Sequence, residues 1–274
     1  MGAPMSIEVG CEINNLTEGE HRALVPRIMR IVFEIHKDLG RLMSETVYKK
    51  AIKLRCEAAG IVPALPEIPI TIRHGTFEKT LFMDLLLAHG LMVEAKTVDR
   101  FHGSHHAQAL QYLFLSDLRY GLLINLRSSS VQKRYVSTTL NRVERQKIEV
   151  HPEEWKEVSP TCKRLKQCLL DLLSDWGAFL QTSLYREAMI HHFGGPEVAL
   201  QKIPVRYRGV TLGEQEVVMI SDDTILAMTA LKERKHEMQL QLQHFLSSTH
   251  IPFMQWINLH NHDVELRTLQ SNLA

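Results

Sequence analysis

Apolar residues form two short runs, at 83–87 and 92–96, which are joined by the turn-forming pair His89-Gly90. Runs of this length on either side of a turn predict two buried strands of a hairpin. Three charged residues lie within these runs: Asp84, Glu94 and Lys96. Charged groups rarely enter a buried strand unless they are paired or bind a metal ion. The pattern therefore marks this hairpin as the first place to look for chemistry.

Two carboxylates beside an ammonium group suit Mg²⁺ and phosphate chemistry. Mg²⁺ prefers oxygen ligands and commonly takes one or two carboxylates together with substrate phosphate oxygens. Glu94 and Lys96 are two residues apart, so both side chains leave the same face of a strand. Glu94 can then bind the metal while Lys96 contacts the attacking water or the developing negative charge. The backbone carbonyl of Ala95 offers a further oxygen ligand. A buried Glu-Lys ion pair, with Asp84 at a strand end, is the alternative interpretation.

The flanking segments alternate between helical and strand patterns. Apolar residues spaced three and four apart predict a helix that ends at Leu39-Gly40: Ile28, Ile31, Val32, Ile35 and Leu39. A second helix is expected from Ser44, a third over 106–113, and another buried strand over 121–126. The resulting order of helices and strands predicts an α/β fold with a mixed sheet flanked by helices.

Further residues around the hairpin extend the pattern. They are Glu45 and Tyr48 before it, Gln108 and Tyr112 after it, and the segment Phe33-Glu34-Ile35-His36-Lys37-Asp38-Leu39-Gly40. With Asp84 and the triplet Glu94-Ala95-Lys96, these residues resemble the GxxExxY proteins, a branch of the PD-(D/E)xK nuclease superfamily. The resemblance covers roughly residues 22 to 138. One departure is that Leu42 stands where the motif has glycine, so the turn before Glu45 is expected to differ.

The resemblance implies a restriction-endonuclease-like fold and a Mg²⁺ (or Mn²⁺) cofactor. Asp84 and Glu94 are implied as metal ligands, and the backbone carbonyl of Ala95 is the further oxygen ligand noted above. Three residues are implied to act in catalysis: Lys96, Glu45 as an added acid near the metal, and Gln108. Five residues are expected to contact nucleic acid: Tyr48, Tyr112, Lys49, Lys133 and Arg134. The last three also belong to a set of basic residues, with Lys50 and Arg100, for which ordinary surface charge is an equally good explanation.

The second half of the chain repeats features of the first in the same order. Residues that recur at nearly constant spacing include Gly177 for Gly40, Tyr185 for Tyr48, Ile203-Pro204-Val205 for Ile68-Pro69-Ile70, Gln241 for Gln108, Phe245 for Tyr112 and Ile257-Asn258-Leu259 for Ile124-Asn125-Leu126. This pattern predicts two tandem copies of one unit that pack as an intrachain pseudo-dimer. The domains are then 18–138, a polar connection over 139–160, and 161–270. A common α/β rhythm without duplication is the alternative.

The second copy lacks the acidic residues of the first. Glu45 aligns with Thr182, Asp84 falls among residues 217–219, and Glu94 falls among residues 227–229. No carboxylate stands at these positions, so we expect one metal ion per chain, bound by the first copy.

Composition agrees with an ordinary globular protein, since 45% of residues are hydrophobic and 23% are charged. The net charge of +1 means that a nucleic-acid site must be a local patch. No segment is apolar enough to cross a membrane, and no signal peptide is recognised, so a cytoplasmic location is expected. The four cysteines show no paired spacing, which favours reduced thiols.

These observations favour a Mg²⁺-dependent nuclease with a single active site in the first copy. Nucleic acid is the expected partner, with DNA preferred over RNA, and the oligomeric state stays open. The alternative is a non-catalytic nucleic-acid-binding or assembly protein that keeps the nuclease fold, because fold alone does not separate the two.

Overall fold

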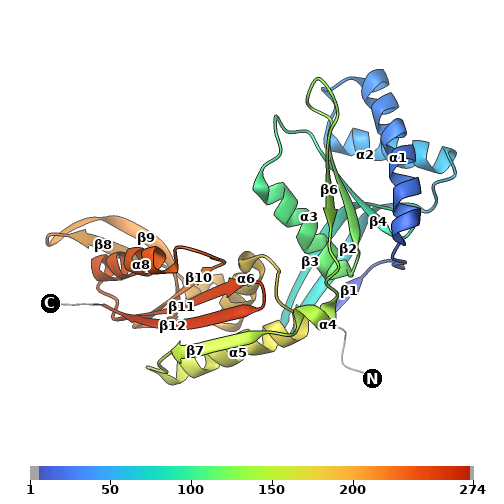
Figure 1. Ribbon diagram of the computed structural model, residues 1–274. Helices are drawn as coiled ribbons and strands as arrows, with labels where there is room; N and C mark the ends of the chain where they lie inside the picture. Colours follow the sequence, from blue (N-terminus) through green and yellow to red (C-terminus); the bar gives the residue numbers. More distant parts are fainter. Residues whose placement is uncertain (1–5, 272–274) are drawn as a thin grey trace. The chain divides into compact units, whose positions relative to one another are not determined.

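The computed structural model describes residues 6–271 of the chain and divides into two compact units (Figure 1). Unit 1 comprises Met1–Arg73 and Glu78–Arg142, and unit 2 comprises His74–Phe77 and Val143–Ala274. Within the described residues, no helix is both long and apolar enough to span a membrane. The four cysteines, Cys11, Cys56, Cys162 and Cys168, are free thiols.

Unit 1 is built on a mixed sheet. Over residues 6–271 this sheet has six strands in the order β1-β2-β3-β4-β5-β6. The strands are β1 (Ile7–Val9), β2 (Ala64–His74), β3 (Phe77–Leu87), β4 (Leu91–Lys96), β5 (Tyr120–Asn125) and β6 (Gln132–Ser137). Strands β4 and β5 are parallel, whereas β3 pairs with β4, and β5 with β6, in antiparallel fashion. The predicted hairpin is therefore confirmed as β3–β4, and β1 is a strand that the apolar pattern did not predict.

Helices cover the sheet of unit 1 on both sides (Figure 1). They are α1 (Glu18–Leu39), α2 (Glu45–Ala58) and α3 (Gly103–Ser116). Helix α1 begins with a capping box in which Thr17 and Glu20 bond each other's backbone amides. The apolar face of α1 and α2 packs in one core with alternate residues of β3, β4 and β5, such as Leu85, Val93 and Ile124. Glu94 and Lys96 alternate with Val93, so their side chains leave the other face of β4.

Unit 2 contains a second six-stranded mixed sheet within the described residues, in the order β7-β12-β11-β10-β9-β8. Its strands are β7 (Glu149–Glu154), β8 (Leu200–Tyr207), β9 (Val210–Ser221), β10 (Thr224–Thr229), β11 (Phe253–His260) and β12 (Asp263–Gln270). Its helices are α4 (Arg142–Arg145), α5 (Pro160–Trp176), α6 (Thr182–His192), α7 (Pro196–Ala199) and α8 (Lys235–Thr249). The segment 139–160, predicted as a connection, thus contains α4 and β7, and β7 pairs with β12.

The two units share their order of elements. Each has two helices, three strands, a helix and two strands, and unit 2 adds the short helix α7 before its three strands. In each unit the third and fourth of these strands are parallel. They differ in the sixth strand, because β1 extends the sheet of unit 1 beside β2, whereas β7 extends that of unit 2 beside β12.

Two hydrogen-bonding arrangements recur in both units. The Tyr48 hydroxyl donates to the carbonyl oxygen of Gly40 at 2.6 Å, and the Tyr185 hydroxyl donates likewise to Gly177. The amide of Asn125 bonds both backbone groups of Val98, and that of Asn258 bonds both backbone groups of Leu231. These shared bonds support the predicted duplication, which itself stays a prediction, as does the packing of the units into a pseudo-dimer.

Candidate active site

Asp84 lies just beyond the point where β3 and β4 stop pairing. The register of the two strands runs to Leu85 opposite Val93 and then stops, so the strands separate beyond this pair. There the carboxylate of Asp84 accepts a hydrogen bond from the backbone amide of Ala95, with 3.1 Å between Oδ2 and N. Asp84 is only 9% exposed, and this bond holds its carboxylate beside Glu94.

Glu94 has one oxygen satisfied and one not. Its Oε1 accepts from the Nζ of Lys96 at 2.8 Å, whereas its buried Oε2 has no hydrogen-bond partner among the described residues. Burial, and after it the nearby charge of Asp84, raises the pKa of Glu94 to about 7. A buried, unpartnered carboxylate oxygen next to a second carboxylate is costly unless a proton or a cation lies between them. The pair therefore fits a divalent cation in the chemistry of its donors.

Two lysines flank the acids. Burial opposes the charged form of Lys96, but the charges of Glu94, Asp84 and Glu45 outweigh it and raise the pKa of Lys96. The Nζ of Lys49, from α2, lies 3.0 Å from Oδ1 of Asp84 and also bonds Glu67. The pKa of Lys49 is raised as well, because these two carboxylates outweigh the effect of burial. Lys49, predicted to contact nucleic acid, instead lies inside the candidate site as the counterion of Asp84.

The first residue of α2 brings a third carboxylate to the end of β4. Oε1 of Glu45 accepts from the backbone amide of Thr97 at 2.9 Å. Because Glu45 also helps to raise the pKa of Lys96, it lies near the ammonium group. The acid is thus oriented by a backbone group just beyond the strand.

Helix α3 contributes Gln108 and Tyr112, one helical turn apart. The Gln108 amide donates to the Tyr112 hydroxyl at 3.2 Å. Burial raises the pKa of Tyr112, with smaller effects from Glu94, Asp84 and Lys96, so the hydroxyl lies near all three charges. Tyr112 is 6% exposed, so it faces the acids rather than an open surface.

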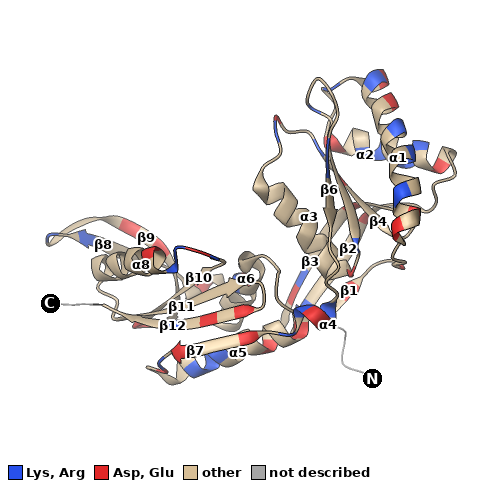
Figure 2. Ribbon diagram, viewed as in Figure 1, with Lys and Arg blue, Asp and Glu red and all other residues tan. Residues whose placement is uncertain are grey.

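The predicted nucleic-acid contacts divide into buried and exposed residues. Tyr48 is fully buried and its hydroxyl bonds the Gly40 carbonyl, so its assignment as a nucleic-acid contact was wrong. The reason is that Tyr48 belongs to the apolar face of an amphipathic helix. Lys133 and Arg134, by contrast, are exposed on β6, where Figure 2 marks basic residues.

Arg134 is aligned with the acids across the sheet. Glu94 pairs with Leu123 on β5, and Leu123 pairs with Arg134 on β6. Paired residues project from the same face, so Arg134 shares a face with Glu94 at two strand spacings, about 10 Å. Its guanidinium lies 5.5 Å from the centre of the Phe101 ring. No periodic pattern marks Phe101, since it stands in the loop between β4 and α3.

Strand register identifies the corresponding positions in unit 2. Asn258 matches Asn125, so Thr229, which pairs with Asn258, stands where Lys96 does, and Ala227 stands where Glu94 does. Continuing to β9 places Val217 at the position of Asp84. Val217 and Ala227 pack in one apolar cluster with Phe245 and Leu246 of α8. No carboxylate is present at these positions, as predicted from the sequence.

Trp256 fills the region of unit 2 that corresponds to the candidate site of unit 1. It pairs with Ala227 in register, is 1% exposed and donates its indole N–H to the Thr229 hydroxyl at 2.9 Å. The indole therefore lies against the counterpart of Lys96 and fills this part of unit 2.

Comparison with known proteins agrees with the composition of the site. Residues 22–138 match the family model of the PD-(D/E)XK nuclease superfamily, and this interval contains every candidate residue described above for unit 1. None of the curated proteins matches the chain. A solved structure described as "Crystal structure of SSO0001" is similar at 19% sequence identity, over 42% of this chain and 64% of that one, with a TM-score of 0.27. The chain therefore spans less than two thirds of the length of that protein.

Proposed function

We propose that unit 1 is a metal-dependent nuclease that hydrolyses phosphodiester bonds with Mg²⁺ or Mn²⁺. The observation that carries the proposal is the buried pair Asp84 and Glu94, with an unpartnered oxygen on Glu94 and the ammonium of Lys96 beside it. This arrangement lies within the segment that matches the nuclease superfamily.

Asp84, Glu94 and the carbonyl of Ala95 would hold the ion. When bound, it would supply charge neutralisation at the phosphodiester and a water made more acidic. Burial, and after it the charge of Asp84, raises the pKa of the Glu94 carboxyl group to about 7, so this group would hold the ion in its ionised form.

Lys96 serves as a fixed positive charge. Its raised pKa keeps the ammonium protonated at neutral pH, so it stabilises negative charge that develops on the phosphate rather than accepting a proton. Glu45 keeps the ammonium in place through their mutual attraction. Gln108, held by Tyr112, is left to contact the substrate backbone or the attacking water.

Substrate contacts extend from the acids towards β6. Arg134 shares the face of Glu94 and is exposed, so its guanidinium can bind a phosphate next to the one that is cleaved. Lys133 alternates with Arg134 on the same strand and adds positive charge at the edge of the sheet. We expect DNA as the substrate, and RNA is the alternative that is tested in the same assay.

The test is cleavage of labelled DNA and RNA with Mg²⁺ or Mn²⁺. Asp84→Asn and Lys96→Met should each lower the rate on the order of 10²- to 10³-fold, because Asp84→Asn removes a ligand of the ion and Lys96→Met removes a positive charge beside the phosphate. Val217→Ala and Thr229→Val change the corresponding positions of unit 2 and should leave the rate unchanged. Circular dichroism and thermal unfolding of all four variants control for folding.

Two results would contradict the proposal. Equal rates for wild type, Asp84→Asn and Lys96→Met would remove these residues from the chemistry. Mn²⁺ binding that is lost in Asp84→Asn, without cleavage of any substrate by the wild type, would favour the non-catalytic binding protein.

A further inference from the structure

Strand β7 brings metal-ligating side chains to the edge of the sheet in unit 2. It pairs with β12 in parallel, with Glu149 opposite Asp263 and His151 opposite Glu265. Glu149 and His151 are two residues apart, so their side chains leave the same face, and the pairing places Asp263 on that face too. Figure 2 shows acidic segments on both strands.

Three ligand atoms converge there. Glu149, His151 and Asp263 each offer one nitrogen or oxygen atom within 4.8 Å of the others. Nε2 of His151 lies 3.4 Å from Oδ1 of Asp263. The carboxylates of Glu149 and Asp263 thus lie within 4.8 Å of each other and of the imidazole, a spacing at which one cation can contact all three groups.

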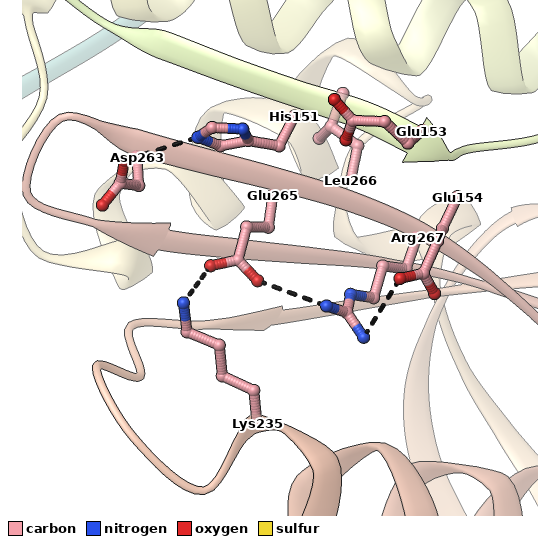
Figure 3. Close-up of a pocket in the computed structure, with 8 residues that line it drawn as sticks. All are labelled: His151, Glu153, Glu154, Lys235, Asp263, Glu265, Leu266 and Arg267. Atoms are coloured by element: carbon pink, nitrogen blue, oxygen red, sulfur yellow. Dashed lines mark hydrogen bonds and ion pairs between the residues drawn. The ribbon is translucent and has the colours of Figure 1, made fainter.

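The adjoining pocket adds to this negative charge (Figure 3). It has a volume of about 400 Å³ and is lined by His151, Glu153, Glu154, Lys235, Asp263, Glu265, Leu266 and Arg267. Both of its cations are already engaged, because Lys235 pairs with Glu265, and Arg267 with Glu265 and Glu154. Glu153 and Asp263 therefore leave the pocket with an excess of negative charge. A phosphate backbone is repelled by such a surface, and a cation is attracted to it.

We propose that Glu149, His151 and Asp263 bind a divalent transition-metal ion of the Zn²⁺ type, which fastens strand β7 to β12. The imidazole favours Zn²⁺ over Mg²⁺, and carboxylate oxygens complete a ligand set that Zn²⁺ accepts. The site differs from that of unit 1 in its ligands, its metal preference and its place in the fold. The ion has a structural role. It links the edge strand β7, which follows α4 in the chain, to its neighbour β12.

Calorimetric titration of the metal-free full-length chain with Zn²⁺ tests the proposal. The titrations are made in the Asp84→Asn background, which removes a predicted ligand of unit 1, so that the remaining binding reports on unit 2. One site is expected, and His151→Asn should weaken it by at least about tenfold, since even the outer partners of metal ligands commonly contribute 10- to 100-fold to affinity. His244→Asn changes an exposed histidine on α8 and should leave the affinity unchanged. Mg²⁺ should bind this site at least tenfold more weakly than Zn²⁺.

Hydrogen exchange gives an independent readout of the fastening. Saturating Zn²⁺ should slow exchange of the β7 amides in the Asp84→Asn protein and in His244→Asn, but not in His151→Asn. The proposal is overturned if His151→Asn binds Zn²⁺ as tightly as its parent or if Zn²⁺ binding requires Asp84. It is also overturned if Zn²⁺ does not change the exchange rate of the β7 amides. Since none of these readouts uses nuclease activity, they stand or fall separately from the function proposed for unit 1.

Discussion

The two units use the same order of helices and strands but differ at the three central positions of the site. Where unit 1 has Asp84, Glu94 and Lys96, strand register places Val217, Ala227 and Thr229 in unit 2. Both units keep the tyrosine–carbonyl bond that follows the first helix and the asparagine that bonds the loop after the third strand. The comparison teaches that backbone-bonding and apolar residues carry this architecture, and that the charged residues at its centre are not required for it.

The strand beside the site, β6 in unit 1 and β12 in unit 2, also differs in how its charge is used. Arg134 and Arg267 occupy matching positions, each in register with the residue that pairs with Glu94 or Ala227. Arg134 is exposed and lies over Phe101, whereas Arg267 lies over Trp256 and pairs with two glutamates. The arginine at this position is thus exposed in unit 1 and paired with carboxylates in unit 2.

The largest expected effect comes from removing the indole that fills the corresponding region of unit 2. Trp256→Ala should lower the free energy of unfolding of unit 2 by about 3–5 kcal/mol, because it opens a cavity at a fully buried position. The rate of DNA cleavage at a temperature where unit 2 stays folded should not change. Urea unfolding measures the first quantity. A loss below about 1 kcal/mol would show that the indole does not support this core.

A pH dependence should be found in unit 1 and traced to Glu94. Burial, then Asp84, raises the pKa of Glu94 from 4.5 to about 7 in the folded, metal-free protein. Between these values the folded state keeps a proton that the unfolded state has lost, so the contribution of Glu94 to stability is fully present below pH 4.5 and is lost as the pH rises through 7. At about 1.4 kcal/mol per pKa unit, the loss is on the order of 3 kcal/mol.

Urea unfolding between pH 5 and pH 8 in the presence of a chelator measures this slope. Glu94→Gln should flatten it, and added Mn²⁺ should reduce it by binding the ionised carboxylate. A variant at the matching position, Ala227→Gly, should keep the slope. An unchanged slope in Glu94→Gln would assign the titration to another group.

Lys49 should compete with the metal. Its ammonium neutralises Asp84 in the metal-free protein, so Lys49→Met should raise the affinity for Mn²⁺ about tenfold, equivalent to about 1.4 kcal/mol. Arg186 stands at the matching position of α6, and Arg186→Met is the control that should leave the affinity unchanged. A weaker affinity in Lys49→Met would show instead that Lys49 orients Asp84 for the metal.

The smallest expected effect concerns the tyrosine–carbonyl hydrogen bond that both units contain. Tyr48→Phe and Tyr185→Phe each remove one hydrogen bond to a glycine carbonyl, so each should cost about 1 kcal/mol in the stability of its own unit. Thermal unfolding of the two variants gives the values. A clear cost in one unit and none in the other would mean that the recurring bond has lost its role in one copy.

Much of this molecule follows from sequence pattern. Apolar spacing predicted the β3–β4 hairpin, and with it the approach of Asp84 and Glu94, because alternation along a strand fixes which side chains share a face. The same spacing predicted the helices that cover the sheet. The absence of carboxylates at the matching positions of unit 2 was predicted as well, because it depends only on which residues stand at 217, 227 and 229.

Other features were decided only by the tertiary structure. The binding partner of Lys49, the burial of Tyr48 and the alignment of Arg134 with Glu94 depend on packing between elements far apart in the chain. Strand β7 is polar and flanked by charges, so its pattern does not identify it as part of a sheet. The sequence by itself determined which residues are apolar, charged and evenly spaced. The packed fold decided which charges meet, because pairing across strands and helices brings together groups whose separation along the chain carries no such information.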